Sequence, residues 1–176
     1  LEDFWELMVN NPLSAGGLLW VFSDEGVLRT DMDGWIDTQK SNAPDGIVGP
    51  YREKEGSFYT IKEIWSPVQT NLDFIPAFYD GNIELENRFH FTNLADCFFE
   101  VQLENLEVKF NEIHTRQTYP VTTGEVKPGE RVTVDLNLPG DWRKYDVLRL
   151  KAVDPHGRNI MSWSWPVNTP EGFAGK

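Results

Sequence analysis

Cysteine, histidine and long apolar runs are all scarce in this chain of 176 residues. Cys97 is the only cysteine, so no disulfide can form within the chain. No apolar run reaches the roughly 18 residues that a membrane-spanning helix requires, and we expect no membrane partner. No signal-peptide pattern is visible, because Leu1 opens inside an amphipathic pattern, and this start in mid-pattern predicts a piece of a longer protein.

Positive charge is also in deficit. The chain carries 16 Lys and Arg against 28 Asp and Glu, a formal net charge of −12 at pH 7. A chain of this charge repels a phosphate backbone, so we expect no nucleic-acid partner. Neither the charge nor the single cysteine fixes the compartment, and we expect a periplasmic or extracellular location in preference to a cytoplasmic one.

The side chains that usually carry chemistry form no recognisable site. Exposed strand or turn positions account for the three histidines, which have no metal-ligand spacing: His90, His114 and His156. Asp31, Asp33 and Asp37 alternate as in a calcium loop, but the terminal Glu of that signature is absent. Cys97 has no nearby base and is predicted to be a core residue. These residues therefore predict neither a metal site nor a nucleophile.

The stretch that organises the chain runs from Gly16 to Asp24, with the sequence Gly-Gly-Leu-Leu-Trp-Val-Phe-Ser-Asp. Two glycines and a continuous apolar run of strand length predict a buried strand of parallel type over residues 16–22. In an α/β barrel, side chains at the carboxyl ends of the strands face the active site. Trp20 would then lie at the mouth of a pocket, with its ring free to stack on a flat ligand. A buried strand in another kind of α/β protein is the alternative.

The residues around this strand predict an α/β arrangement in the first third of the chain. A short helix is expected over residues 3–8. Residues 23–46 are acidic and broken by Gly and Pro, which predicts a long loop that is either functional or a solvated surface. A second helix is expected over residues 58–65, with Ser57 as its cap. We place the domain boundary near Pro67, which ends that helix.

Beyond this boundary the period of the hydrophobic pattern changes from 3.6 to two. Apolar and polar residues alternate in several runs, which begin at Ile83, Phe99, Leu106 and Val132. Turn signals such as Asp80-Gly81-Asn82 separate the runs. About seven strands in roughly 110 residues, without a helical pattern, predict an immunoglobulin-like antiparallel β-sandwich.

Three motifs give the chain a family resemblance. They are Gly16-Gly17-Leu18-Leu19-Trp20, Asp45-Gly46-Ile47-Val48 and Trp65-Ser66-Pro67-Val68. This order resembles the end of the catalytic barrel in the β-galactosidases of glycoside hydrolase family 2. There a Gly-Gly strand ending in Trp is followed by a loop, an Asn/Asp-Gly-Leu/Ile-Val segment, the last barrel helix and a β-sandwich. The resemblance covers most of the chain and is most specific in residues 1–68.

The resemblance implies a mainly β chain with two parts. Residues 1–66 would be the C-terminal remnant of a (β/α)8 TIM-barrel, a short α/β piece, and residues 67–176 an immunoglobulin-like β-sandwich. Family members hydrolyse β-linked sugars with retention, using two carboxylates. By the resemblance both carboxylates would precede Leu1, so this fragment alone is expected to be inactive. Its partners would be the carbohydrate substrate and the remainder of the barrel. Whether the protein forms a homo-oligomer stays open.

The resemblance also assigns roles to single residues. Trp20 matches the tryptophan on which the substrate sugar rests, and Asp45 matches a residue that supplies a polar contact or a metal ligand in some members. The chain departs from the family at Asn42, where an aromatic is common, and at Tyr51, which replaces the Asp of an Asp-Arg pair. We expect a structural role for Arg52. No cofactor is expected in this chain. The resemblance leaves open whether the parent has a sodium or magnesium site. It also leaves open whether the sugar is galactose, glucuronic acid or mannose.

Two other classes of function compete with a glycosidase fragment. One is a carbohydrate-binding or adhesive β-sandwich module, which should keep an exposed aromatic strip on the sandwich. The other is a purely structural spacer domain. Trp163 and Trp165 lie two apart on the closing strand, and we expect them to pack in a core or between domains rather than to form a sugar platform. The apolar edge of residues 16–22 is expected to fold back on the sandwich or to drive dimer formation.

Overall fold

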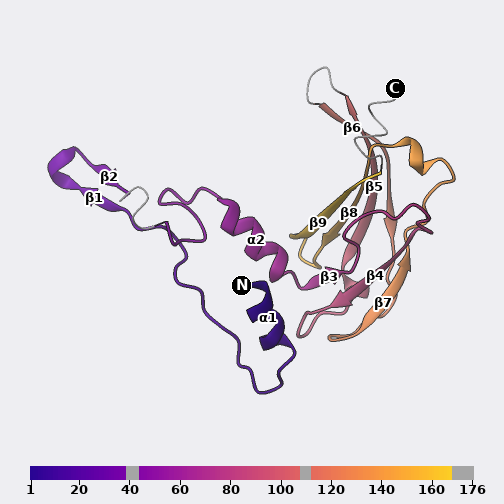
Figure 1. Ribbon diagram of the computed structural model, residues 1–176, viewed down its shortest axis with the longest axis horizontal. Coiled ribbons are helices and arrows are strands. Elements are labelled where there is room, and N and C mark those ends of the chain that lie inside the picture. Colours follow the sequence, from indigo (N-terminus) through magenta and orange to yellow (C-terminus); the bar gives the residue numbers. More distant parts are fainter. Residues whose placement is uncertain (39–43, 108–111, 168–176) are drawn as a thin grey trace. The chain divides into compact units, whose positions relative to one another are not determined.

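The computed structural model describes residues 1–38, 44–107 and 112–167. The described chain is mainly β, with antiparallel sheets and two short α-helices, which confirms the predicted class of a mainly β sandwich chain (Figure 1). It divides into two compact units, Leu1–Trp65 and Ser66–Lys176. Neither α-helix in the described ranges has the length and apolarity that crossing a membrane requires.

The second unit consists of two antiparallel sheets (Figure 1). One sheet has the order β3-β4-β7, with β3 at Val68–Thr70, β4 at Asn82–Asn87 and β7 at Arg131–Asp135. The other has the order β6-β5-β8-β9, with β6 at Glu112–Val121, β5 at Phe98–Glu107, β8 at Val147–Val153 and β9 at Asn159–Pro166. The alternation of period two beyond residue 67 therefore predicted the right kind of structure.

The core of this unit comes from alternate residues of its strands, as half-buried strands require. On β5 the inward-facing side chains are fully buried: Phe99, Val101 and Leu103. Trp163 and Trp165 on β9 lie opposite core residues of β8 and belong to the same hydrophobic core. Trp165 is buried and Trp163 packs against the buried cluster, so the expectation that these indoles pack in a core is confirmed.

Asn87 is a fully buried polar residue at the end of β4. Its side-chain amide donates to the carbonyls of Thr92 (2.9 Å) and Val126 (2.8 Å). Its side-chain oxygen accepts from the N–H of Phe89 at 3.0 Å. These bonds turn the chain out of the sheet. The apolar alternation that begins at Ile83 continues to Phe89 and Phe91, but the strand ends at Asn87 and Phe91 is almost fully exposed.

Cys97 is half-buried and packs against the core, as predicted. Burial, and to a lesser extent the charges of Asp154 and Asp96, raise the pKa of its thiol to about 11. Because the thiolate is the nucleophilic form, a thiol that stays protonated at neutral pH fits a structural role.

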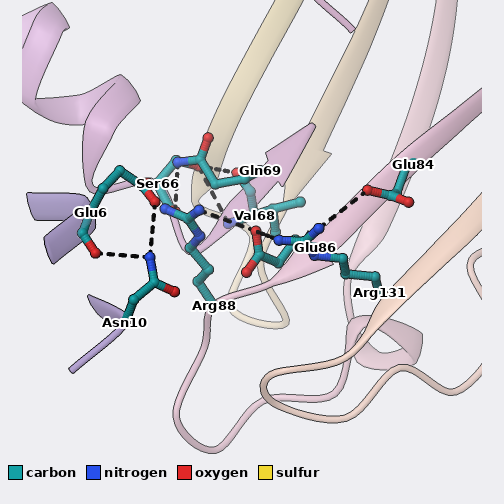
Figure 2. A network of polar contacts seen from close by, with 9 residues as sticks. All are labelled: Glu6, Asn10, Ser66, Val68, Gln69, Glu84, Glu86, Arg88 and Arg131. Atoms are coloured by element: carbon teal, nitrogen blue, oxygen red, sulfur yellow. Dashed lines mark hydrogen bonds and ion pairs between the residues drawn. The ribbon is translucent and has the colours of Figure 1, made fainter. Parts of the chain in front are cut away.

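The outer face of the three-stranded sheet carries a row of ion pairs (Figure 2). Arg131 on β7 reaches the carboxylates of Glu84 (3.7 Å) and Glu86 (3.4 Å) on β4. Arg88 approaches Glu86 at 3.1 Å. Because the Arg131 side chain is 60% exposed, its two pairs together contribute at most about 1 kcal/mol. The pair of Arg88 and Glu86 is less exposed, at 19% and 21%.

The first unit holds the two α-helices, α1 at Glu2–Val9 and α2 at Gly56–Ile64. Both helices were predicted from the sequence. The indoles of Trp5 in α1 and Trp65, which follows α2, pack with their ring centroids 5.5 Å apart. A tilted aromatic contact of this kind contributes about 0.5–1.5 kcal/mol beyond the burial of its apolar surface, and it joins the two ends of this unit.

The predicted cap of α2 is wrong. Glu55 occupies the N-cap position, and Ser57 lies inside the helix. The Ser57 hydroxyl donates instead to the carbonyls of Gly46 (3.3 Å) and Ile47 (3.0 Å). A serine hydroxyl can hydrogen-bond to any nearby backbone group. Here it binds carbonyls about ten residues away in the sequence instead of the free N–H groups at the start of α2.

Residues 16–22 do not form the buried strand that their apolar run predicts. They form no strand and belong to no sheet, and Leu18 and Trp20 are 100% and 82% exposed. A strand needs a neighbour to pair its backbone N–H and C=O groups. In the described ranges such a neighbour, residues 45–48, lies only beside the end of the run, from Val21 onward.

Residues 23–46 are not the structureless loop that their composition predicts. β1 at Val27–Arg29 and β2 at Trp35–Asp37 form an antiparallel hairpin (Figure 1). Asp33 and Gly34 close its turn in left-handed backbone conformations, with φ of 53° and 79°. Asp and Gly tolerate this conformation better than most residues. The pair Asp33-Gly34 is therefore a turn signal, which was not recognised among the many acidic residues of this stretch.

Candidate functional site

The candidate site is built on two short segments that run side by side, one following Trp20 and the other beginning at Asp45. The Val21 N–H donates to the Asp45 carbonyl at 3.2 Å. Farther along, the Asp24 N–H donates to the Val48 carbonyl at 2.9 Å, and the pairing there is parallel. Val48 is buried, so the paired segments have an apolar anchor.

Gly46 permits the close approach of these segments. Its N–H donates to a carboxylate oxygen of Asp24 at 2.6 Å. A Cβ at this position would collide with the backbone of Ser23 and Asp24. The hydroxyl of Ser57 in α2 holds the Gly46 carbonyl from the other side. The pairing of the two segments therefore requires glycine at position 46.

These contacts bring the backbones of the two predicted site residues, Trp20 and Asp45, next to each other. Both side chains are exposed. The peptide bond between Trp20 and Val21 is cis, and its N–H is the one that donates to Asp45. An indole offers an apolar face and a carboxylate accepts hydrogen bonds, and a sugar ring uses both kinds of contact. The roles of Trp20 and Asp45 in binding stay a prediction.

Arg52 lies in a tight turn just after the second segment. Its N–H donates to the Gly49 carbonyl at 2.9 Å, and its φ is 68°. The central carbon of its guanidinium lies 5.5 Å from the centroid of the Phe22 ring, a cation–π distance. This contact agrees with the structural role expected for Arg52. The contacts of Phe22 and Asp24 were not predicted from the sequence, because their partners, Arg52 and Gly46, lie far along the chain.

The β1–β2 hairpin connects the two segments and carries a bidentate ion pair. Arg29 donates to both carboxylate oxygens of Asp31, at 2.8 and 2.6 Å, and reaches Asp37 at 3.4 Å. The hydrogen bonds with Asp31 raise the pKa of Arg29 and lower the pKa of Asp31. Two of the aspartates that alternate as in a calcium loop are thus paired with one arginine.

Metal-ligating side chains do not gather anywhere in the described part of the chain, where no group of three or more His, Cys, Asp or Glu could hold an ion. His90 and His156 are exposed, as predicted. The side chain of His114 and all of Asn42 lie outside the described residues. The side chains that the two segments expose, the Trp20 indole and the Asp45 carboxylate, are of the kinds that bind a polar ligand with an apolar face.

Comparison with protein-family models gave no match. Among curated proteins, the chain is similar to a β-galactosidase of Actinobacillus pleuropneumoniae, with 26% identity over 150 residues. The match covers 78% of this chain and 13% of that β-galactosidase. The chain is thus distantly related to a glycoside hydrolase, and it spans only a small part of that relative's length.

Among solved structures, the chain is similar to the exo-chitosanase CsxA of Amycolatopsis orientalis. A variant of CsxA in complex with PNP-β-D-glucosamine matches at 12% identity and a TM-score of 0.35, over 69% of this chain and 13% of that chain. A further crystal structure of CsxA matches at 14% identity and a TM-score of 0.33, over the same shares. Similarity at this level does not place any residue of this chain on the chitosanase.

Proposed function

We propose that this chain is the C-terminal part of a retaining glycoside hydrolase of family 2 that acts on β-linked sugars, with β-galactosides as the leading substrates. Residues 1–66 would complete its catalytic barrel, and residues 67–176 would form an immunoglobulin-like domain that supports the barrel. The observation that carries this proposal is the adjacency of the Trp20 and Asp45 segments in a chain related to a β-galactosidase.

In this proposal Trp20 is the floor on which the sugar ring stacks and Asp45 is a polar contact. The two catalytic carboxylates belong to the rest of the protein, so the chain alone hydrolyses nothing. Three apolar side chains close to Trp20 in the sequence are exposed: Leu13, Leu18 and Phe22. Their exposure favours the proposal that another part of the protein covers them. Exposed apolar patches mark interaction sites, and the remaining barrel strands are the partner proposed here. The periplasmic or extracellular location and the oligomeric state stay predictions.

A carbohydrate-binding module is the second candidate. It would need exposed aromatic rings on the sandwich, and the second unit does present Phe74, Phe78 and Phe91 to solvent. These three lie in connections between strands, whereas the large indoles of β9 pack in the core. A strip of rings on one sheet face, which stacks on an extended sugar chain, is not formed by the side chains that the structure describes.

Hydrolysis of nitrophenyl glycosides tests the proposal. The longer protein that contains this chain and the 176-residue chain alone would each be assayed with nitrophenyl β-galactoside, β-glucuronide and β-mannoside. We expect the longer protein to release nitrophenol from at least one of them and the chain alone to stay at the blank. Hydrolysis by the chain alone, or a longer protein that is inert on all three, would overturn the proposal.

A further inference from the structure

β9 is the last strand of the four-stranded sheet and has the sequence Asn-Ile-Met-Ser-Trp-Ser-Trp-Pro. One of its edges pairs with β8 (Figure 1). In the described ranges, no backbone group bonds to residues 160–166 from the other edge. An open edge of this kind presents a row of N–H and C=O groups to which a strand of another chain can bond.

The backbone groups of two serines face this open edge. Along an antiparallel strand, every second residue turns its N–H and C=O to the same side. Just beyond β9, the Val167 N–H donates to the Asp146 carbonyl, which precedes β8, at 2.8 Å. The register of β8 and β9 is regular from residue 161 onward. By this alternation Trp165 turns its N–H and C=O to β8, whereas Ser162 and Ser164 turn theirs to the open edge.

The side chains of β9 suit pairing with an identical strand. Ser162 and Ser164 lie on the face of the sheet away from the core, and Ser164 is exposed. Met161 and Trp163 lie on the inner face, where they are half-buried and pack at the margin of the core. No residue of β9 is charged. Two copies therefore place no like charges opposite each other along this strand, although each chain has a net charge of −12.

A two-fold axis at Trp163 gives such a pair its register. Two-fold symmetry brings together residues at equal distances from the axis, so Ser162 lies opposite Ser164 of the partner subunit. These serines exchange N–H···O=C bonds across the interface, because their backbone groups face the open edge. Their hydroxyls meet on the outer face and the two Trp163 indoles meet on the inner face, and both are favourable cross-strand pairs.

The other sheet edges of this unit carry features that prevent such pairing. β3 has only three residues, and β7 carries Arg131 and Asp135 at its ends. β6 contains Pro120, which has no N–H to donate. Short strands, charges and proline are the means by which natural sheets avoid association at their edges. β9 has its proline only at the last residue, Pro166, so in the described part of this unit its edge is the one that accepts a partner strand.

We propose that two copies of this protein associate through β9, which pairs antiparallel with β9 of the partner subunit about a two-fold axis at Trp163 and joins two four-stranded sheets into one. A second copy is favoured over another extended segment, because symmetry supplies the same uncharged strand in the matching register. The inference does not depend on the function proposed above.

Sedimentation and amide hydrogen exchange test this interface on the wild-type 176-residue chain. We expect a dimer in which the amides of Ser162 and Ser164 are protected from exchange. Dilution to monomer should remove the protection of these two amides, because they then face water. The amides of Trp163 and Trp165 should stay protected at both concentrations, since they bond to β8 within one chain.

A proline substitution tests the same interface in the chain and in the longer protein. Ser164→Pro removes an N–H that points away from β8, so the strand keeps its pairing within the chain. We expect the dissociation constant of the dimer to rise at least about tenfold, because the bonds to both Ser162 residues are lost. Ser164→Ala, the matched control, keeps the N–H and should raise the constant no more than about threefold.

Each other outcome overturns the interface. A wild-type chain that is monomeric at every concentration excludes it, and so does a dimer in which the Ser162 and Ser164 amides exchange freely. A dimer that a folded Ser164→Pro chain still forms equally well is held together elsewhere. If the chain dimerises and Ser164→Pro leaves the mass of the longer protein unchanged, another part of that protein covers β9. None of these results alters the proposed function, which the hydrolysis assay tests by itself.

Discussion

Gly46 is the residue on which the geometry of the candidate site most depends. It sits where the two paired segments come closest, with its N–H on the Asp24 carboxylate and its carbonyl on the Ser57 hydroxyl. The sequence singled it out only as part of the Asp45-Gly46-Ile47-Val48 motif. The structure gives the physical reason, because a side chain here would overlap the backbone of the facing segment.

Replacing this glycine should therefore damage the site. For Gly46→Ala in the longer protein, we expect kcat/KM on its best nitrophenyl glycoside to fall by about ten- to a hundredfold, since displacing a binding group by about 1 Å can cost that much. Gly56→Ala is the matched control, because a Cβ on Gly56, the first residue of α2, meets nothing within 4 Å. Equal activity of both variants would contradict this account of Gly46.

At the residue scale, the sequence named Trp20 and Asp45 as candidates, because a resemblance matches residues one by one, and their roles stay a prediction. It could not predict that Asp24 binds the N–H of Gly46 or that Arg52 packs on Phe22. These contacts join residues that are far apart in the sequence. They become visible only when the chain has folded back on itself.

At the scale of elements, period-two alternation predicted β4, β5 and β7. The run that begins at Leu106 belongs to the end of β5 and is not a strand of its own, and β6 was not predicted. β3 has only three residues, too few for a period to be recognised, and no strand was predicted there. The hairpin was missed because acidic residues dominate its turn. The strand over residues 16–22 was predicted wrongly, because an apolar run becomes a strand only where another strand pairs with it.

The pairing of β5 with β8 includes a buried ion pair. Glu104 on β5 meets Arg149 on β8 at 3.0 Å, and only 5% of the Glu104 side chain is exposed. The arginine is 28% exposed, so water screens part of the interaction. Removing the cation leaves a carboxylate in a place where water does not reach it easily, and that cost exceeds the value of the pair itself.

For Arg149→Met we expect the free energy of unfolding to fall by about 2 kcal/mol, because Glu104 is left without its cation. Adding Glu104→Gln should restore part of this loss, since the amide carries no charge. Urea unfolding of the 176-residue chain, followed by tryptophan fluorescence, measures both. Arg131→Met, which removes a mostly exposed arginine from its pairs with Glu84 and Glu86, should cost at most about 1 kcal/mol. A larger cost for Arg131 than for Arg149 would contradict this ranking.

At the scale of the whole molecule, the two units differ in how much of their apolar surface they bury. The unit Ser66–Lys176 has a continuous core of strands from both sheets. In the unit Leu1–Trp65, by contrast, many large apolar side chains are exposed, with Leu18 and Trp20 among them. A sequence can predict which residues are apolar, but not whether the surface that would cover them is on the same chain.

The central claim is that Trp20 supports a sugar ring in a longer glycoside hydrolase. The most direct test is kcat/KM of that protein on its glycosyl fluoride, with Trp20→Ala compared against Trp35→Ala, which removes an indole elsewhere in the same unit. We predict a loss of about ten- to a hundredfold for Trp20→Ala, because the apolar face of the sugar loses its platform, and no loss for Trp35→Ala. A folded Trp20→Ala protein with unchanged kcat/KM would contradict the account.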